Sequence, residues 1–148
     1  MPPNAVTFAA LALSSRPPMP LSYPAYLINL DHQPDRLAAF HERNRPANID
    51  FERFPAVDGS ALSDDERRLI TRFDRMTPGA IGCAASHKAL WERCRAIRKP
   101  IVVLEDDAWL RHDAATSLPA VIASIGTFWD ILLLGYNTDI EMKLRPGQ

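Results

Sequence analysis

Four short apolar runs, each ending in polar or turn residues, give the chain its expected frame. They are "AYLINL" (25–30), "FERFPAV" (51–57), "PIVVLE" (100–105) and "WDILLLG" (129–135), and each has the length of a strand. The run at 100–105 lacks apolar–polar alternation, so we predict that both of its faces are buried. We expect 129–135 to form a last buried strand.

Helical patterns occupy the segments between these runs. Pro34 suits the first turn of a helix, and Ser63 with Glu66 three positions later is the capping-box arrangement. Pro78 opens a long helix that reaches residue 97, and a further helix is predicted over 113–125. The long helix has an apolar face that includes Trp91, which we expect to lie in the core rather than to stack on a sugar.

Strands that alternate with helices predict an α/β domain with a mainly parallel sheet. In such sheets ligands bind beyond the carboxyl ends of the strands. Three polar segments fall at these ends, namely Asn29-Leu30-Asp31, Val57-Asp58-Gly59 and Glu105-Asp106-Asp107. We therefore expect the three segments to converge on one site.

Length and composition are those of one globular domain. The chain has 148 residues, 47% of them hydrophobic and 24% charged, with a net charge of −1. Without a basic field, a nucleic-acid partner is not expected, and no apolar run is long enough to span a bilayer. We expect residues 1–22, which end in a Pro-rich stretch, to be a flexible extension before a single domain at 23–148.

The two cysteines are predicted to remain unpaired. Cys83 and Cys94 lie on the same predicted helix, and eleven residues of helix separate them by about 16 Å along its axis. A disulfide requires Cα atoms within about 7 Å. Free thiols favour a reducing compartment, the cytoplasm. Cys83 is expected to pack in the core rather than to act as a nucleophile, because no base partner is evident.

The acidic triplet Glu105-Asp106-Asp107 suggests a site for a hard divalent cation. Mg²⁺ and Mn²⁺ prefer oxygen ligands, and Mg²⁺ usually combines one or two protein carboxylates with substrate phosphates. Such a cation would stabilise the charge that develops on a departing diphosphate. The alternative is that these acids only cap the next helix or face solvent.

Five segments in a fixed order carry a family resemblance. They are "YLINLDHQPDR", "FPAVDGSAL", "TPGAIGCAASHKALWERC", "PIVVLEDDAWL" and "WDILLLG". Together they resemble the glycosyltransferase family 25 enzymes, which include bacterial lipooligosaccharide galactosyl- and glucosyltransferases and collagen galactosyltransferases. The resemblance implies a GT-A-like (Rossmann-like) three-layer α/β/α fold. It further implies inverting transfer of galactose or glucose from a UDP-sugar to a glycan acceptor in lipopolysaccharide biosynthesis. The enzyme would be cytoplasmic, with at most peripheral association with the inner face of the membrane.

The resemblance also implies roles for individual residues. Asp107 and Glu105 are the expected ligands of Mn²⁺ or Mg²⁺, although Glu stands where a strict Asp-any-Asp motif has Asp. The residues expected to bind the UDP-sugar are Asn29, Asp31, Arg36, Asp58, Gly59, Ser86, His87, Glu105 and Asp106. For several of these a structural role explains the residue equally well: Arg36 as a solvated helix charge, Asp58-Gly59 as a plain turn, and His87 as a structural histidine.

The general base that an inverting transferase needs is not identified by the sequence. Asp130 and Asp139 are candidates, and His87 is a further candidate catalytic residue. Family members normally continue well beyond the run at 129–135, so we expect the acceptor side to be incomplete. A non-catalytic sugar-nucleotide-binding remnant is therefore the alternative function. A receiver-like signalling domain is less favoured, because Gly135 stands where a receiver would need its phosphoacceptor aspartate.

Overall fold

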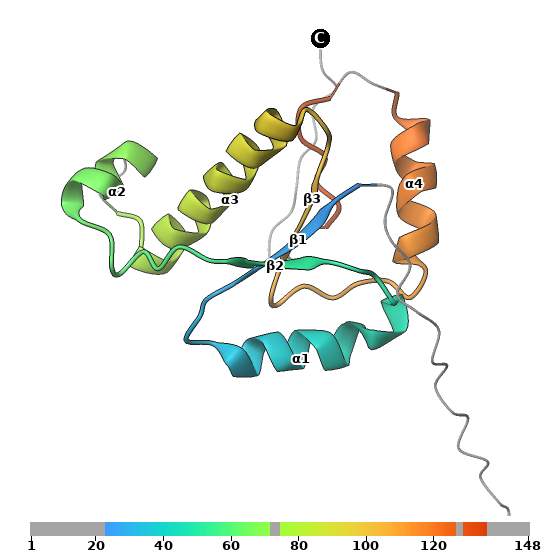
Figure 1. The fold of residues 1–148 in the computed structure, drawn as a ribbon, viewed down its shortest axis with the longest axis horizontal. Helices are drawn as coiled ribbons and strands as arrows, with labels where there is room; N and C mark the ends of the chain where they lie inside the picture. Colours follow the sequence, from blue (N-terminus) through green and yellow to red (C-terminus); the bar gives the residue numbers. More distant parts are fainter. Residues whose placement is uncertain (1–22, 72–74, 127–128, 136–148) are drawn as a thin grey trace, which may run out of the picture.

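The computed structural model of the chain describes residues 23–71, 75–126 and 129–135. The predicted extension at 1–22 and the candidate Asp139 lie outside these ranges. Along the chain the elements are β1 (Ala25–Asn29), α1 (Pro34–Asn44), the short 3₁₀ helix η1 (Arg45–Ala47), β2 (Glu52–Pro55), α2 (Asp64–Ile70), α3 (Pro78–Ile97), β3 (Val102–Glu105) and α4 (Ala114–Ser124) (Figure 1). Strands and helices alternate as predicted.

The three strands form an all-parallel sheet in the order β2-β1-β3. β1 lies in the middle, and all five of its residues are buried. The register pairs Asn29 with Pro55 of β2 and Ile28 with Glu105 of β3. Because the strands are parallel, their carboxyl ends meet at one edge of the sheet. The polar segments that we expected to converge therefore follow strands that end at the same edge of the sheet.

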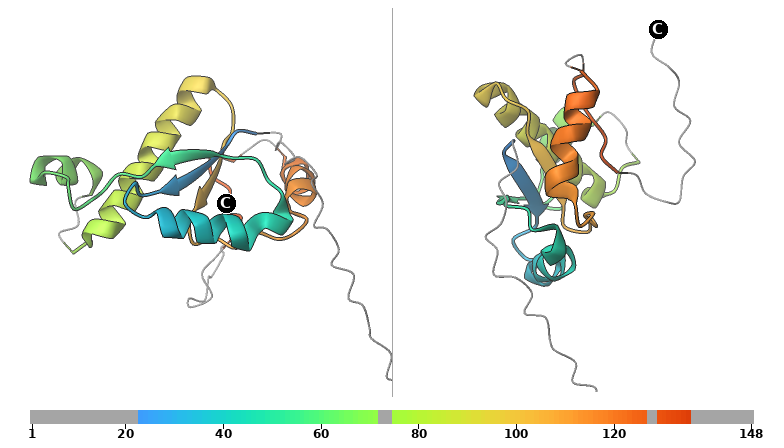
Figure 2. Two further views of the ribbon diagram at one scale, coloured as in Figure 1. Left: turned by 60° about the horizontal axis from the view of Figure 1, so that its bottom comes forward. Right: turned by 90° about the vertical axis from the view of Figure 1, so that its right-hand side faces the viewer.

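Helices cover both faces of the sheet, which makes the fold a Rossmann-like α/β/α arrangement (Figure 2). On one face Leu27 and Leu104 pack with Phe40 of α1, and Leu118 of α4 packs against the same cluster. On the other face Ile28 packs with Leu90 of α3, against which Val103 is partly buried. β3 therefore contributes to both apolar clusters. Its face toward α1 is buried as predicted, whereas on the face toward α3 Val103 is only partly buried and Glu105 is exposed.

Local sequence accounts for where the helices begin. Pro34 occupies the first turn of α1, where its missing N–H costs nothing. The predicted capping box of α2 is present: the Ser63 hydroxyl accepts from the Glu66 amide, and the Glu66 carboxylate accepts from the Ser63 amide at 2.8 Å. The Thr77 hydroxyl caps α3 by accepting from the Ala80 amide at 3.2 Å. None of the helices within the described residues has both the length and the apolar composition needed to cross a bilayer.

Two glycines bring the loop after β2 into backbone contact with α3. A Cβ atom at Gly59 would lie 1.9 Å from the carbonyl oxygen of Pro78, and one at Gly82 would lie 2.4 Å from that of Val57. No side chain fits between these backbones, so only glycine is compatible with the approach at both positions. The Ser86 hydroxyl completes the contact by accepting from the Val57 amide at 2.9 Å.

Two predictions about apolar residues are wrong. Residues 129–135 form no strand, and Ile131, Leu133 and Leu134 are exposed. An apolar run becomes a buried strand only where a sheet edge pairs with it and layers cover it, and the described part of the chain supplies neither for this run. Trp91 is also not a core residue, because its side chain is 49% exposed, whereas its neighbour Leu90 is fully buried.

Candidate functional site

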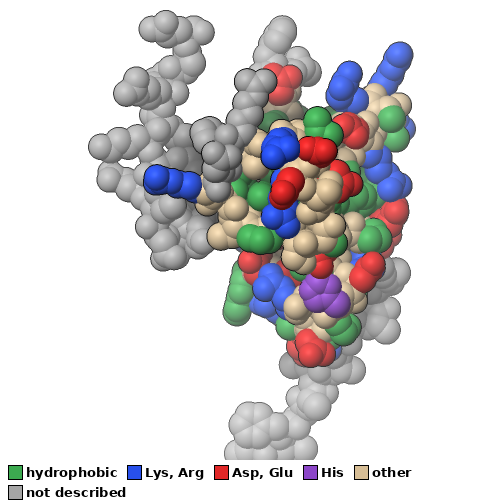
Figure 3. Space-filling model, turned by 90° about the vertical axis from the view of Figure 1, so that its left-hand side faces the viewer, with side chains coloured by type: hydrophobic (Ala, Val, Ile, Leu, Met, Phe, Trp, Pro, Cys, Tyr) green, Lys and Arg blue, Asp and Glu red, His purple; other side chains and the backbone are tan. Residues whose placement is uncertain are grey.

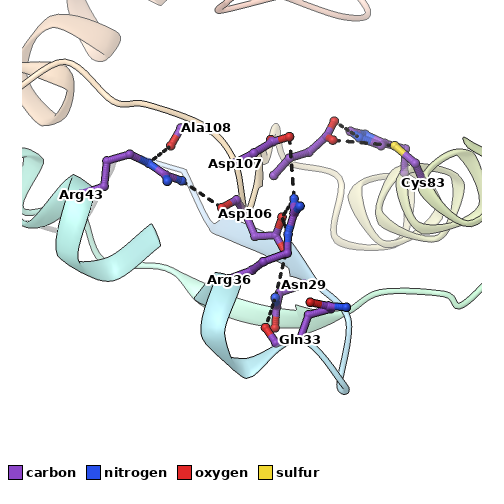
Figure 4. Close-up of polar contacts among 10 residues, drawn as sticks. Asn29, Gln33, Arg36, Arg43, Cys83, Asp106, Asp107 and Ala108 are labelled. Atoms are coloured by element: carbon purple, nitrogen blue, oxygen red, sulfur yellow. Dashed lines mark hydrogen bonds and ion pairs between the residues drawn. The ribbon is translucent and has the colours of Figure 1, made fainter. Parts of the chain in front are cut away.

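The alternation of side chains along β3 sends neighbouring acids to opposite faces of the sheet. Glu105 lies two positions after Val103, which is on the α3 face of the sheet. Asp106 lies two positions after Leu104, which is on the α1 face. Their contacts agree: Glu105 meets residues of α3, and Asp106 meets residues of α1 (Figure 4). The triplet is therefore not one cluster, because its first two members have separate surroundings.

Asp106 is held by hydrogen bonds on both carboxylate oxygens. Oδ1 accepts from two guanidinium nitrogens of Arg36, of which Nε is at 2.8 Å, and Oδ2 accepts from the Asn29 amide at 2.8 Å. Burial acts to raise the pKa of Asp106, but the hydrogen bonds from Arg36 and Asn29 outweigh it and hold the pKa below its ordinary value of 3.8. Asp106 is thus a charged structural residue that joins β3 to β1 and α1.

Asn29 is the centre of this network and is only 2% exposed. Besides Asp106, its side-chain nitrogen donates to the Gln33 carbonyl at 3.1 Å, and its side-chain oxygen accepts from Arg53 Nε at 3.1 Å. Arg53 also donates to the Asp31 carboxylate at 2.6 Å. The loop after β1 is therefore tied to both neighbouring strands through one buried amide.

A second set of contacts fixes the turn after β3 to the end of α1. Arg43 donates to the carbonyl oxygens of Asp106 and Ala108 at 3.0 and 3.2 Å. The buried Asn44 side chain donates to the Ala108 carbonyl at 3.0 Å and accepts from the Leu110 amide at 2.8 Å. These bonds satisfy turn carbonyls that have no ladder partner.

On the opposite face, Glu105 contacts two side chains of α3. Its Oε1 lies 3.1 Å from His87 Nε2, and its Oε2 lies 3.9 Å from the Cys83 sulfur. The hydrogen bond with His87 lowers the pKa of Glu105 below 4.5, although partial burial opposes it. Burial, and then the charge of Glu105, raise the pKa of the Cys83 thiol above 9.0. Cys83 was expected only to pack, and it is also a polar partner of Glu105.

Asp107 differs from both of its neighbours because its carboxylate faces solvent. The side chain is 71% exposed, and one of its oxygens lies 3.8 Å from the Arg36 guanidinium (Figure 4). With Glu105, whose side chain is 50% exposed, it supplies two accessible carboxylates at one strand end. Carboxylate oxygens are the type of ligand that a hard divalent cation prefers, usually together with waters and phosphate oxygens.

The remaining predicted site residues have mixed surroundings. Asp58 is partly exposed, with one oxygen 3.9 Å from His32 Nδ1 and the other accepting from the Ser60 amide. Ser86 is fully buried. Its hydroxyl donates to the Gly82 carbonyl and accepts from the Val57 amide. Gly59 is buried against α3. The structure therefore gives Ser86 and Gly59 packing contacts, and it leaves Asp130 exposed.

Comparison with known proteins identifies the family. The sequence model described as glycosyltransferase family 25 (LPS biosynthesis protein) matches residues 22–143, most of the chain. The chain belongs to glycosyltransferase family 25. The resemblance carried by the five ordered segments is thereby confirmed.

Curated family 25 proteins of insects are among the relatives. The chain is 39% identical over 94 residues to a "Glycosyltransferase 25 family member" of Aedes aegypti, a match covering 55% of this chain and 16% of that protein. It is 33% identical over 124 residues to one of Anopheles gambiae, covering 74% of this chain and 21% of that protein. The matched region therefore amounts to about a fifth, or less, of the length of these relatives.

Three residues that structure the site of this family 25 chain were not singled out from its sequence. They are Arg43 and Asn44 on α1 and Arg53 on β2. A helical signal for the first two exists: Arg36, Phe40, Arg43 and Asn44 recur at spacings of three and four, which places them on one side of α1. For Arg53, the signal is a cation within a short strand, between Glu52 and Phe54.

Proposed function

We propose that the chain is the donor-binding part of a glycosyltransferase that moves a hexose, galactose or glucose, from a UDP-sugar to a glycan acceptor in lipopolysaccharide biosynthesis. Transfer is inverting and assisted by a divalent cation, Mn²⁺ or Mg²⁺. Family membership supports this proposal. The observation that carries it is the division of the triplet: Asp106 is fully engaged within the protein, while Asp107 and Glu105 remain accessible at the carboxyl end of β3.

Asp107 and Glu105 would hold the cation, which when bound would neutralise charge on the diphosphate of the donor. The chain's own groups prepare this position. His87 orients Glu105 through the 3.1 Å contact, and the Asn29–Asp106–Arg36 network fixes the strand end that carries Asp107. Arg36 lies beside both aspartates and supplies a positive charge near the phosphates. Asp31 and Asp58 stand at the ends of the neighbouring strands as candidate contacts for the nucleoside.

Overall charge agrees with a small anionic donor bound locally rather than with a nucleic-acid partner. The face shown in Figure 3 carries acidic and basic side chains interspersed, without a continuous basic surface. The donor site therefore has to depend on individual groups and a cation rather than on a broad positive field. We propose a cytoplasmic location for the protein, in keeping with the free thiols of Cys83 and Cys94.

The decisive experiment is titration of the full chain with UDP, with and without Mn²⁺. We expect binding that Mn²⁺ strengthens, and at least a tenfold loss of that Mn²⁺-dependent gain in Asp107→Ala. Asp65→Ala is the control, because it removes another exposed carboxylate, from α2 and away from the strand ends. Absence of UDP binding to the wild type would contradict the donor site, and equal binding by Asp107→Ala would contradict the role of Asp107.

The alternative function, a non-catalytic remnant that binds sugar nucleotides, has a separate measurement. Hydrolysis of UDP-galactose and UDP-glucose in Mn²⁺ is followed by release of UDP. Turnover that Asp107→Ala abolishes supports the transferase, whereas tight binding without any turnover favours the remnant. Asp130→Asn, which alters an exposed candidate base, should lower turnover without changing UDP affinity if Asp130 takes part in proton transfer.

A further inference from the structure

Three side chains of different ligand chemistry meet where α3 crosses the end of β3. The cysteine sulfur, the histidine nitrogen and one carboxylate oxygen of Cys83, His87 and Glu105 all lie within 4.8 Å of one another. Cys83 and His87 are four residues apart, so they share one side of α3. Glu105 approaches them from the sheet.

A tetrahedral metal site sets the spacing that the three ligand atoms would have to reach. With metal–sulfur bonds of about 2.3 Å and metal–nitrogen or metal–oxygen bonds of about 2.0 Å, tetrahedral angles place ligand atoms roughly 3.3–3.5 Å apart. In the structure, Glu105 Oε1 lies 3.1 Å from His87 Nε2, and the other carboxylate oxygen, Oε2, lies 3.9 Å from Cys83 Sγ. One carboxylate oxygen of Glu105 lies within 4.8 Å of both the sulfur and the nitrogen. A bound cation would draw these three atoms closer together, and three protein ligands leave a fourth position open.

Contacts with the loop after β2 hold the backbone of α3 next to the two helical ligands, Cys83 and His87. Gly82, directly before Cys83, lies against the Val57 carbonyl without space for a Cβ atom. Ser86, directly before His87, is fully buried and bonded to the Val57 amide at 2.9 Å. Each helical ligand therefore follows an anchored residue, so the backbone positions of Cys83 and His87 are held in place without a cation.

We propose that Cys83, His87 and Glu105 form a second cation site, selective for a borderline ion of the Zn²⁺ class. Thiolate and imidazole ligands suit Zn²⁺ and Co²⁺, whereas Mg²⁺ and Mn²⁺ favour the all-oxygen position at Asp107. On binding, the Cys83 thiol loses its proton to solvent and its sulfur coordinates the cation. Glu105 belongs to both positions, so occupation of the sulfur-containing site withdraws one ligand from the Mn²⁺ position and weakens donor binding.

Co²⁺ is the probe, because a cobalt–thiolate bond has a near-ultraviolet charge-transfer absorption that an all-oxygen site lacks. Titration of the full chain under a non-thiol reductant should produce this band with the wild type. Cys83→Ser should abolish it, and Cys94→Ser, which removes the other thiol of α3, should retain it. His87→Gln should weaken Co²⁺ binding at least tenfold, and Zn²⁺ should displace Co²⁺ from the wild type.

The outcomes separate this inference from the donor-site proposal. Asp107→Ala should keep the cobalt–thiolate band even where Mn²⁺-dependent UDP binding is lost. Added Zn²⁺ should weaken Mn²⁺–UDP binding in the wild type and have no such effect in Cys83→Ser. No band with the wild type, a band that survives Cys83→Ser, or a band equally lost in Cys94→Ser would each overturn the proposed site.

Discussion

At the end of β3, neighbouring acidic residues have different surroundings on the two faces of the sheet. On the α1 side, Asp106 is enclosed by Asn29 and Arg36, with both oxygens hydrogen-bonded. On the α3 side, Glu105 contacts His87 and Cys83 and is half exposed. Asp107, one residue beyond, projects into solvent.

The difference shows that an acidic triplet can combine a structural residue with accessible ligands. A carboxylate whose lone pairs are already used by an arginine and an amide stabilises the fold, and it cannot also bind a cation without losing those partners. The accessible carboxylates of Asp107 and Glu105 can bind a cation, and they contribute less than Asp106 to the stability of the fold. Stability and ligand binding should therefore respond separately to substitutions on the two sides.

The largest expected effect on stability is that of Asn29→Leu. The substitution removes the hydrogen bonds from the buried amide to Asp106 and Gln33 and the bond it accepts from Arg53. Leaving such groups unsatisfied should cost about 2–4 kcal/mol in the free energy of unfolding, measured by urea denaturation. Asp31→Asn, which alters only an exposed partner of Arg53, should change it by about 0.5 kcal/mol or less. Similar losses in both variants would refute the central role of Asn29.

A smaller effect should distinguish Asp106→Asn from Asp107→Asn. The first breaks the ion pair with a half-exposed Arg36 and should cost about 1 kcal/mol. The second should stay within about 0.5 kcal/mol of the wild type, because Asp107 is exposed. Parallel measurement of UDP binding in Mn²⁺ should give the reverse order, with the greater loss in Asp107→Asn. Equal destabilisation by both would show that the two sides do not differ.

The smallest effect is in the acid dependence of stability, measured in a chelator. The folded-state pKa values of Asp106 and Glu105 lie below their ordinary values of 3.8 and 4.5. The unfolded chain therefore binds protons at higher pH than the folded chain, and the free energy of unfolding should fall as pH drops below about 4.5. Asp106→Asn removes the contribution that arises from Asn29, Arg36 and Arg43, so its acid limb should be shallower. An unchanged slope would contradict that assignment.

Local sequence signals predicted most of the fold. The strands at 25–30, 51–57 and 100–105, the proline at the start of α1 and the capping box at Ser63 all depend on residues close in sequence, and each is present. The alternation of β3 would even have assigned Glu105 and Asp106 to opposite faces. That step requires only the position of the strand, since successive side chains point to opposite sides.

The predictions that failed depend on surroundings that a single segment does not specify. Whether 129–135 is buried depends on a partner for it, and whether Trp91 is buried depends on how far the sheet extends beneath α3. For the candidate site, the sequence identified the polar strand ends. It did not predict that Asp106 is held by other side chains of the protein while Asp107 is exposed. Donor binding by Asp106 stays a prediction; its contact with Asn29, which sequence reasoning did not foresee, comes from a residue 77 positions earlier in the chain.

The hydrogen bond between the Val57 amide and the Ser86 hydroxyl has a practical consequence for solution studies. It links the loop after β2 to α3 at the point where Gly59 and Gly82 touch. Exchange of this one amide with deuterium requires the loop and helix to separate, so its rate reports the opening of that contact. A single backbone resonance thus provides an internal measure of how often the loop after β2 separates from α3, independent of any ligand or enzymatic assay.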